Sequence, residues 1–190
     1  MGLEKTFQTG RIAIHPSNPD VVYVGALGRL YGPNEDRGLY KTTDGGETWS
    51  KVLYVDDQTG VVDVDMHPTD PDTLLVATYE RARDGFDTND PAKRWGPGGG
   101  IWKTTNGGTN WTRIKNGLPS CNIGRVGIDY YRKDPNVLMA IIELALVLVY
   151  TCVLLIKTCS KSKVACATFG FGDTAQGCLL YTSPSPRDRG

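Results

Sequence analysis

The chain of 190 residues lacks an excess of either charge, because 21 lysines and arginines balance 21 aspartates and glutamates. Basic and acidic residues are interleaved, so the sequence shows no positive patch of the kind that binds a nucleic-acid backbone. It also lacks a phosphate-binding loop, a dinucleotide-binding fingerprint and any spacing typical of metal ligands. We therefore expect no nucleic-acid partner, no metal and no cofactor.

Histidine and cysteine are scarce, with two and five residues respectively. His15 and His67 each precede a proline in a repeated segment, which favours a structural role in a turn over metal binding. Cys121 is the one cysteine before residue 143, and we expect a partly buried thiol outside any disulfide. The four later cysteines show neither CxxC pairs nor an assignable disulfide framework, so they do not indicate a redox compartment.

An internal repeat is the clearest feature that the sequence does have. The octapeptide TTDGGETW at 42–49 recurs as TTNGGTNW at 104–111. Its two glycines can adopt the positive φ of a tight hairpin, and its Asp or Asn can cap the turn. A tryptophan then covers the hairpin from the returning strand. We therefore expect structural roles for Thr42, Asp44, Gly46, Trp49, Thr104, Asn106, Gly108 and Trp111.

The repeat extends upstream of each octapeptide. Residues 12–24 match residues 62–76, and a third copy runs over 126–139. The aligned prolines Pro19, Pro71 and Pro135 are spaced by 52 and 64 residues. Proline is excluded from central ladder positions, so each marks the turn between two antiparallel strands. We therefore predict four strands in each unit, joined in order by a turn, a variable loop and a hairpin. Four antiparallel strands make up one propeller blade.

The pattern predicts an all-β fold, a partial β-propeller of four-stranded antiparallel blades. An N-terminal extension (1–10) precedes two complete blades (11–60 and 61–123) and the first half of a third (124–142). Propellers close with about four to eight blades, so we expect this chain to be a fragment. Residues 1–10 show no signal peptide and no strand that would obviously close a ring.

Composition changes after Glu143, where an apolar run at 144–156 begins. A transmembrane helix over 137–156 would be long enough, but Glu143 lies inside it and its first residues are needed as a blade strand. A signal segment would be in the wrong place. The final LLYTSPSPRDRG resembles translated sequencing-adapter tails. We therefore interpret 143–190 as a non-homologous tail from a frameshift or adapter that packs poorly against the blades. We expect any helix at 144–156 to be detached or draped on an open edge, and no membrane partner unless 137–156 is genuine.

The octapeptides, together with residues 25–41 and 53–60, carry a family resemblance. Residues 8–142 resemble sortilin/VPS10-type propellers with Asp-box (BNR-repeat) hairpins, and are most similar to bacterial sortilin-like "glycosyl hydrolase" sequences. The resemblance implies a scaffold that binds protein, peptide or carbohydrate, and an extracytoplasmic or secreted location. The wider superfamily includes sialidases, xyloglucanases and photosystem assembly factors. It therefore leaves two alternatives open, part of a glycoside hydrolase or an assembly factor of a membrane complex.

Blade topology predicts where a ligand could bind. The loops between second and third strands, and those between blades, lie at one end of the blades and vary in length. The longest, 80–95, mixes arginines, carboxylates and aromatics, as carbohydrate and peptide sites do. A solvated loop with paired charges is the alternative. The candidate binding residues are Tyr31, Glu35, Asp36, Arg37, Arg81, Arg83, Asp84 and Trp95.

Catalysis would require a specific arrangement of side chains, and the sequence of these loops does not indicate one. A glycosidase needs two carboxylates about 5 to 10 Å apart. Glu35 with Asp36, and Asp84 with Asp87, are candidates by placement alone. A sialidase would use an arginine cluster and a tyrosine, and Arg81, Arg83 and Tyr79 are present, but their context does not resemble that site. We therefore assign no catalytic residue and expect binding rather than turnover.

Overall fold

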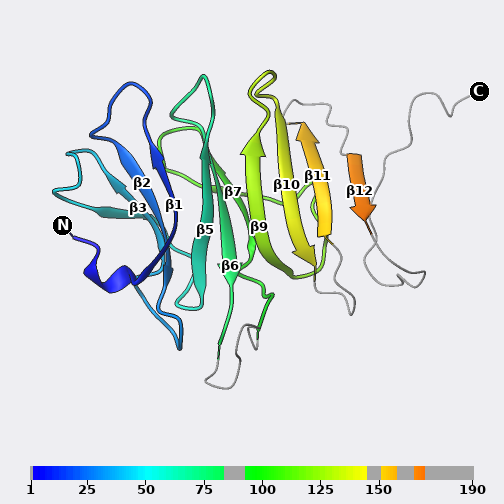
Figure 1. The fold of residues 1–190 in the computed structure, drawn as a ribbon, viewed down its shortest axis with the longest axis horizontal. Coiled ribbons are helices and arrows are strands. Elements are labelled where there is room, and N and C mark those ends of the chain that lie inside the picture. The colour runs from blue at the N-terminus through cyan, green and yellow to red at the C-terminus, as the bar shows by residue number, and fades with distance from the viewer. Residues whose placement is uncertain (1, 84–92, 145–150, 158–164, 170–190) are drawn as a thin grey trace, which may run out of the picture.

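A computed structural model describes residues 2–83, 93–144, 151–157 and 165–169. These residues form three four-stranded antiparallel sheets, each in sequential strand order (Figure 1). The strands are β1 (Gln8–Ile14), β2 (Val22–Gly28), β3 (Gly38–Thr42), β4 (Ser50–Leu53), β5 (Thr59–Met66), β6 (Leu74–Glu80), β7 (Gly100–Thr104), β8 (Thr112–Ile114), β9 (Ile123–Tyr130), β10 (Val137–Leu144), β11 (Thr151–Lys157) and β12 (Ala165–Phe169).

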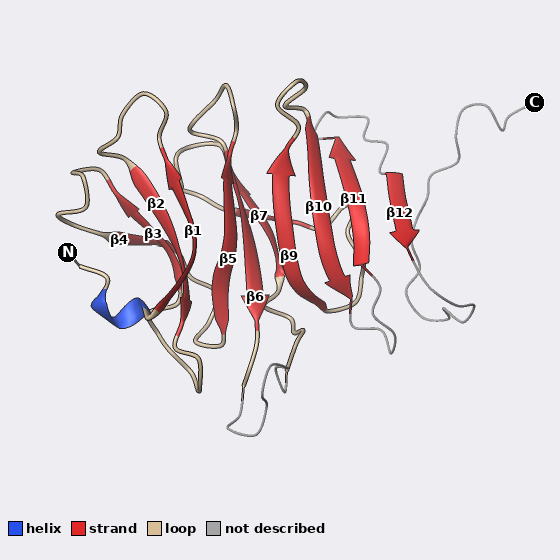
Figure 2. Cartoon of the chain, viewed as in Figure 1, coloured by secondary structure: helices blue, strands red, loops and turns tan. Residues whose placement is uncertain are grey.

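Helix is almost absent from the described residues, as the colouring in Figure 2 shows. The one helical element there is a 3-10 turn, η1 (Glu4–Thr6), so between residues 11 and 140 the described part contains strands and loops. Within those ranges, no helix has the length and apolar character needed to cross a bilayer. The chain is an all-β partial propeller, as the repeat predicted.

The sheets pack face to face, with the first strand of the second sheet, β5, lying between the first strands β1 and β9 of the other two (Figure 1). Because side chains alternate across a strand, β6 contributes to two cores. Leu74 and Val76 pack toward the first sheet, whereas Leu75 and Ala77 pack toward the third. All four are fully buried, which explains why residues 74–77 of this strand form a continuous apolar run.

Hydrogen bonds from backbone amides to aspartate side chains also join the second and third sheets. The Oδ2 atom of Asp63 accepts from the backbone N–H of Ile128 at 2.9 Å, and that of Asp65 accepts from Tyr130 N–H at 2.7 Å. These amides belong to the first strand of a sheet, where one edge has no neighbouring strand. The carboxylates therefore satisfy buried donors that the ladder leaves unpaired.

Each octapeptide forms the hairpin between the third and fourth strands. Gly45 and Gly46 have φ of 72° and 96°, and Gly107 and Gly108 have 63° and 90°. In the first copy, Thr42 Oγ1 accepts from Gly46 N–H at 2.9 Å and donates to Asp44 Oδ1 at 2.6 Å. The Trp49 indole donates to Gly46 O at 3.2 Å.

The second copy repeats these bonds. Thr104 Oγ1 donates to Asn106 Oδ1 at 2.8 Å and accepts from Gly108 N–H at 3.1 Å, and the Trp111 indole donates to Gly108 O at 3.1 Å. Asn106 Oδ1 accepts from Asn110 N–H at 3.0 Å. Asp44 accepts from Thr48 N–H at the same distance. An amide and a carboxylate thus cap the same turn.

The third sheet differs from the expected half blade. β11 pairs with β10 from Val137↔Lys157 to Glu143↔Thr151, and β12 pairs with β11. Residues 151–157 therefore form a strand, although the sequence admitted a detached helix at 144–156. Their β-branched and apolar side chains favour a strand, and β10 offers an open edge. The rest of the proposed tail, 145–150, 158–164 and 170–190, lies outside the described residues, so its origin stays a hypothesis.

Candidate ligand-binding site

Backbone hydrogen bonds group the loops into two ends of the blades. Gly45 N–H donates to Asp20 O at 3.0 Å, and Gly107 N–H to Asp72 O at 2.9 Å, which joins each octapeptide hairpin to the turn between first and second strands. At the opposite end, Asn34 N–H donates to Asp57 O at 2.9 Å. We call this second end, formed in the described part of the chain by residues 29–37, 54–58, 81–83, 93–99 and 115–122, the loop face.

Arg37 is on the loop face but points inward. It is 2% exposed, and its guanidinium donates to Leu27 O, Arg29 O and Gly32 O at 2.5, 3.3 and 3.1 Å. Burial, followed by repulsion from Arg81, lowers the pKa of Arg37 from its ordinary value. These internal acceptors give Arg37 a loop-bracing role, and the ligand contact that the sequence suggested stays a prediction.

The neighbouring candidates Tyr31, Glu35 and Asp36 remain near the surface. Tyr31 is 52% exposed. The backbone carbonyl of Glu35 accepts from the Lys51 ammonium, and that of Asp36 accepts from the Tyr40 hydroxyl at 3.2 Å. The loop is therefore anchored through its backbone, and the side chains of Glu35 and Asp36 are left for solvent or a ligand.

A cavity of about 430 Å³ opens beside the first residues of the long loop. Arg81 and Arg125 line it together with Tyr79, and its remaining lining comes from Gln8, Thr9, Leu27 and Val62. The side chains thus come from all three sheets. Arg81 donates to Gln8 Oε1, which fixes its guanidinium against the first sheet. We call this the arginine cavity.

The arginine cavity is electrostatically one-sided. Burial, followed by repulsion from Arg83, lowers the pKa of Arg81, and Arg125 adds to that repulsion. The Nε atoms of Arg81 and Arg83 are buried and have no hydrogen-bond partner in the described part of the chain. None of the described lining residues is acidic. Such a site suits an anion, because a guanidinium binds carboxylate or phosphate through charge-assisted hydrogen bonds.

The base of the long loop is held by a buried carboxylate. Glu80 is 4% exposed, pairs with the Lys93 ammonium and accepts from Gly98 N–H at 2.7 Å. Ala82 and Lys93 exchange backbone hydrogen bonds of 3.1 and 3.0 Å. A Cβ at Gly96 would lie 2.3 Å from Glu80, so any larger residue there would displace the Glu80 carboxylate. This packing sets the direction in which Arg81 and Arg83 leave β6.

Of the remaining candidates of the long loop, the structure describes Trp95 and does not bring it into the arginine cavity. Trp95 is half-buried and is absent from the cavity lining. Asp84, and Asp87 with which it was paired as a possible catalytic couple, lie outside the described residues. Arg125 was missed by the sequence reasoning, because its role depends on β9 passing beside β6.

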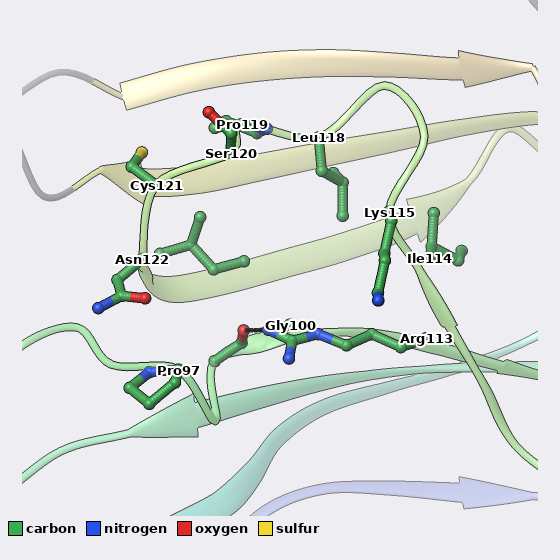
Figure 3. A pocket seen from close by; sticks show the side chains of 12 residues that line it. Pro97, Gly100, Arg113, Ile114, Lys115, Leu118, Pro119, Ser120, Cys121 and Asn122 are labelled. Carbon is green, nitrogen blue, oxygen red and sulfur yellow. Dashed lines mark hydrogen bonds between the residues drawn. The ribbon is translucent and has the colours of Figure 1, made fainter. Parts of the chain in front are cut away.

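A second cavity of about 430 Å³ lies between the end of β8 and residues 118–123 (Figure 3). Arg113 donates to Gly99 O at 2.5 Å and lies 5.9 Å from the Trp102 ring centre. The side chain of Lys115 is directed toward Arg113 in Figure 3. Because Arg113 already has an internal acceptor and an aromatic contact, this cavity offers less unsatisfied positive charge than the arginine cavity.

Comparison with known proteins adds a family and a fold. The family model Sortilin-Vps10, described as "Sortilin, neurotensin receptor 3,", matches residues 2–144. An ancestral GH74 enzyme of known structure superposes with a TM-score of 0.50 at 14% identity, over 85% of this chain and 24% of that enzyme. The GH74 xyloglucanase from Xanthomonas campestris is 17% identical, with a TM-score of 0.34, over 77% and 29%.

The chain therefore spans less than a third of the length of either enzyme. At this identity the likeness to the ancestral enzyme shows a shared fold and nothing about activity. No curated protein matches the chain.

Proposed function

The chain belongs to the Sortilin-Vps10 family, and we propose that it is part of a β-propeller binding scaffold with Asp-box hairpins, whose loop face takes a protein, peptide or glycan ligand. The arginine cavity carries this proposal, because it combines an open volume with two arginine side chains and no acidic residue in its described lining. We propose that it holds a carboxylate, either of a peptide or of an acidic sugar.

The roles of the cavity residues follow from their contacts. Arg81 is oriented by Gln8 and has a buried Nε without a partner, so an incoming carboxylate would gain a donor that the chain itself leaves unused. Arg125, on β9 of the third sheet, lines the other side of the cavity and adds a second positive charge. Tyr79 is 6% exposed and supplies an apolar wall.

Two alternative functions are less well supported by this geometry. A glycoside hydrolase needs two carboxylates across the bound sugar, and the described lining of the arginine cavity contains none. Glu80 is already paired with Lys93. An assembly factor would dock on a broad surface, whereas these arginines are recessed in a cavity, which suits the end group of a ligand.

Binding of acidic ligands to the soluble fraction of the full chain tests the proposal. Calorimetry would compare a peptide with a free C-terminal carboxylate, its amidated form and a uronic-acid oligosaccharide. We expect one of the carboxylates to bind, and Arg81→Gln or Arg125→Gln to weaken binding about tenfold or more, as expected for loss of a charge-assisted hydrogen bond.

Arg132→Gln is the matched control, since Arg132 is exposed near the opposite end of β9. Equal binding by wild type and both cavity variants would refute the assignment of the site. Hydrolysis of an aryl glycoside, abolished by changing Glu35 or Asp36, would replace the scaffold with an enzyme.

A further inference from the structure

The chain contains two Asn-Gly pairs, at 106–107 and 116–117, and the fold places them in different surroundings. An asparagine before glycine is prone to spontaneous deamidation, because glycine has no side chain to hinder attack by its backbone nitrogen on the asparagine side chain. The attack requires the asparagine side chain and the glycine N–H to approach each other. Hydrogen bonds that hold either group therefore slow the reaction.

Asn106 is held in the second octapeptide hairpin. Its Oδ1 atom accepts from the Thr104 hydroxyl at 2.8 Å and from Asn110 N–H at 3.0 Å. The N–H of Gly107 donates to Asp72 O at 2.9 Å. Attack on the Asn106 side chain would have to break the hydrogen bonds of both groups, so the hairpin protects this pair.

Asn116 and Gly117 lie in a turn on the loop face, between the second and third sheets. Leu118 N–H donates to Lys115 O at 3.3 Å, and Gly117, with a φ of 79°, occupies the third position of a type II turn. Asn116 and Gly117 are both exposed. Neither the Asn116 side chain nor Gly117 N–H has a hydrogen-bond partner in the described part of the chain. The two reacting groups are therefore free to meet.

We propose that Asn116 is a site of spontaneous deamidation in the folded protein, whereas Asn106 is not. The Gly117 nitrogen gives its proton to hydroxide and attacks Cγ of Asn116. The new N–C bond closes a succinimide ring, and the side-chain nitrogen takes up a proton and leaves as ammonia. Water then opens the ring at one of its two carbonyl groups, which yields aspartate or isoaspartate. Water is the only reactant that the change consumes.

The products alter the rim of the second cavity. Lys115 and Leu118, on either side of the reacting pair, line that cavity (Figure 3). Aspartate at 116 adds a negative charge next to Lys115, and isoaspartate also inserts a methylene group into the backbone of the turn. The modification therefore makes the rim less positive and changes how the turn is held.

Incubation of the soluble fraction of the full chain at mildly alkaline pH tests the proposal, because the attacking nitrogen must lose its proton. An arginine-specific protease yields residues 95–113 and 114–125 as separate peptides, so mass spectrometry can follow both pairs in one sample. We expect Asn116 to react at least about tenfold faster than Asn106, because the hairpin bonds must break first. In urea the hairpin is lost, and the two rates should become similar.

Three variants assign the reaction to these residues. Asn116→Gln should abolish the acidic species that ion-exchange chromatography separates from the incubated protein. Asn122→Gln is the matched control and should retain that species, since Asn122 is exposed in the same peptide but precedes isoleucine. Thr104→Val removes the hydroxyl that holds Asn106, so deamidation of Asn106 should accelerate while that of Asn116 stays unchanged. Far-UV circular dichroism of each sample verifies that the strands are retained.

Each contrary outcome overturns the proposal. Equal rates for Asn106 and Asn116 in the folded protein would show that the hairpin bonds give no protection. An Asn116 that reacts in urea but stays intact in the folded protein would show that the turn prevents the attack. An acidic species that persists in Asn116→Gln would place the modification at another residue.

Discussion

At the residue scale, the two octapeptides show that a carboxylate and an amide can cap the same hairpin turn. Asp44 accepts hydrogen bonds from the Thr42 and Thr48 side chains and from Thr48 N–H, whereas Asn106 accepts from Thr104 and Asn110. The pKa of Asp44 is therefore lowered from its ordinary value, chiefly by the Thr42 hydroxyl and then by Thr48. The turn requires a hydrogen-bond acceptor at this position, and only the Asp44 copy uses a titratable one. The stability of the first hairpin should therefore depend on pH.

The pH dependence of Asp44 can be measured against its uncharged counterpart. A carboxyl whose pKa falls on folding stabilises the fold above its unfolded pKa, about 4, and loses that contribution as pH falls through the folded value. We expect the melting temperature of wild type to fall more steeply below pH 4 than that of Asp44→Asn. Asn106→Asp should make the melting temperature fall more steeply below pH 4 than in wild type. The same dependence of melting temperature on pH below 4 in all three proteins would contradict the capping role of the Asp44 carboxylate.

Arg37 gives a second prediction at this scale, because its guanidinium serves the chain's own carbonyls. Arg37→Ala would remove a buried guanidinium and leave Leu27 O, Arg29 O and Gly32 O without their donor. We expect the free energy of unfolding to fall by about 2 to 4 kcal/mol in urea titrations. Arg29→Ala, at an exposed position, should change it by about 0.5 kcal/mol or less. A surface-like effect of Arg37→Ala would show that the loop does not depend on it.

At the element scale, local chemistry made the strands and hairpins predictable. Gly45, Gly46 and the flanking Thr42 determine a hairpin within eight residues of sequence, so both copies could be located. Contacts between segments that are distant in the sequence could not be predicted in this way. The Asp63 and Asp65 bonds to β9, the inward turn of Arg37 and the approach of Arg125 to Arg81 all depend on how sheets pack. Of the residues that line the arginine cavity, the sequence therefore pointed to Tyr79 and Arg81 but missed Arg125.

The third sheet carries a prediction about the gene. The family match ends at residue 144, and β11 and β12 are joined by TCSKSKV, which has no Asp-Gly-Gly or Asn-Gly-Gly turn. We propose that residues 143–190 do not continue the repeat. Genomic DNA across the Glu143 codon should then continue into a variable loop, a third strand and another octapeptide. An uninterrupted genomic reading frame that encodes residues 143–190 would refute the frameshift hypothesis.

At the scale of the whole molecule, the exposed faces of the first and third sheets determine how the chain behaves in solution. Ile12, Ile14, Met139 and Ile141 expose apolar surface beside open strand edges, a combination that promotes association and proteolysis. We expect residues 1–190 to elute as a broad, high-molecular-weight distribution in size-exclusion chromatography, to be cleaved rapidly in limited proteolysis and to release nothing from aryl glycosides or sialosides. The double variant Ile14→Glu/Ile141→Arg is the matched control and should elute later and more narrowly, because charge now occupies both faces. If wild type instead ran as a monodisperse monomer with one cooperative unfolding transition, three sheets would be sufficient for a stable fold and the exposed faces would need no partner.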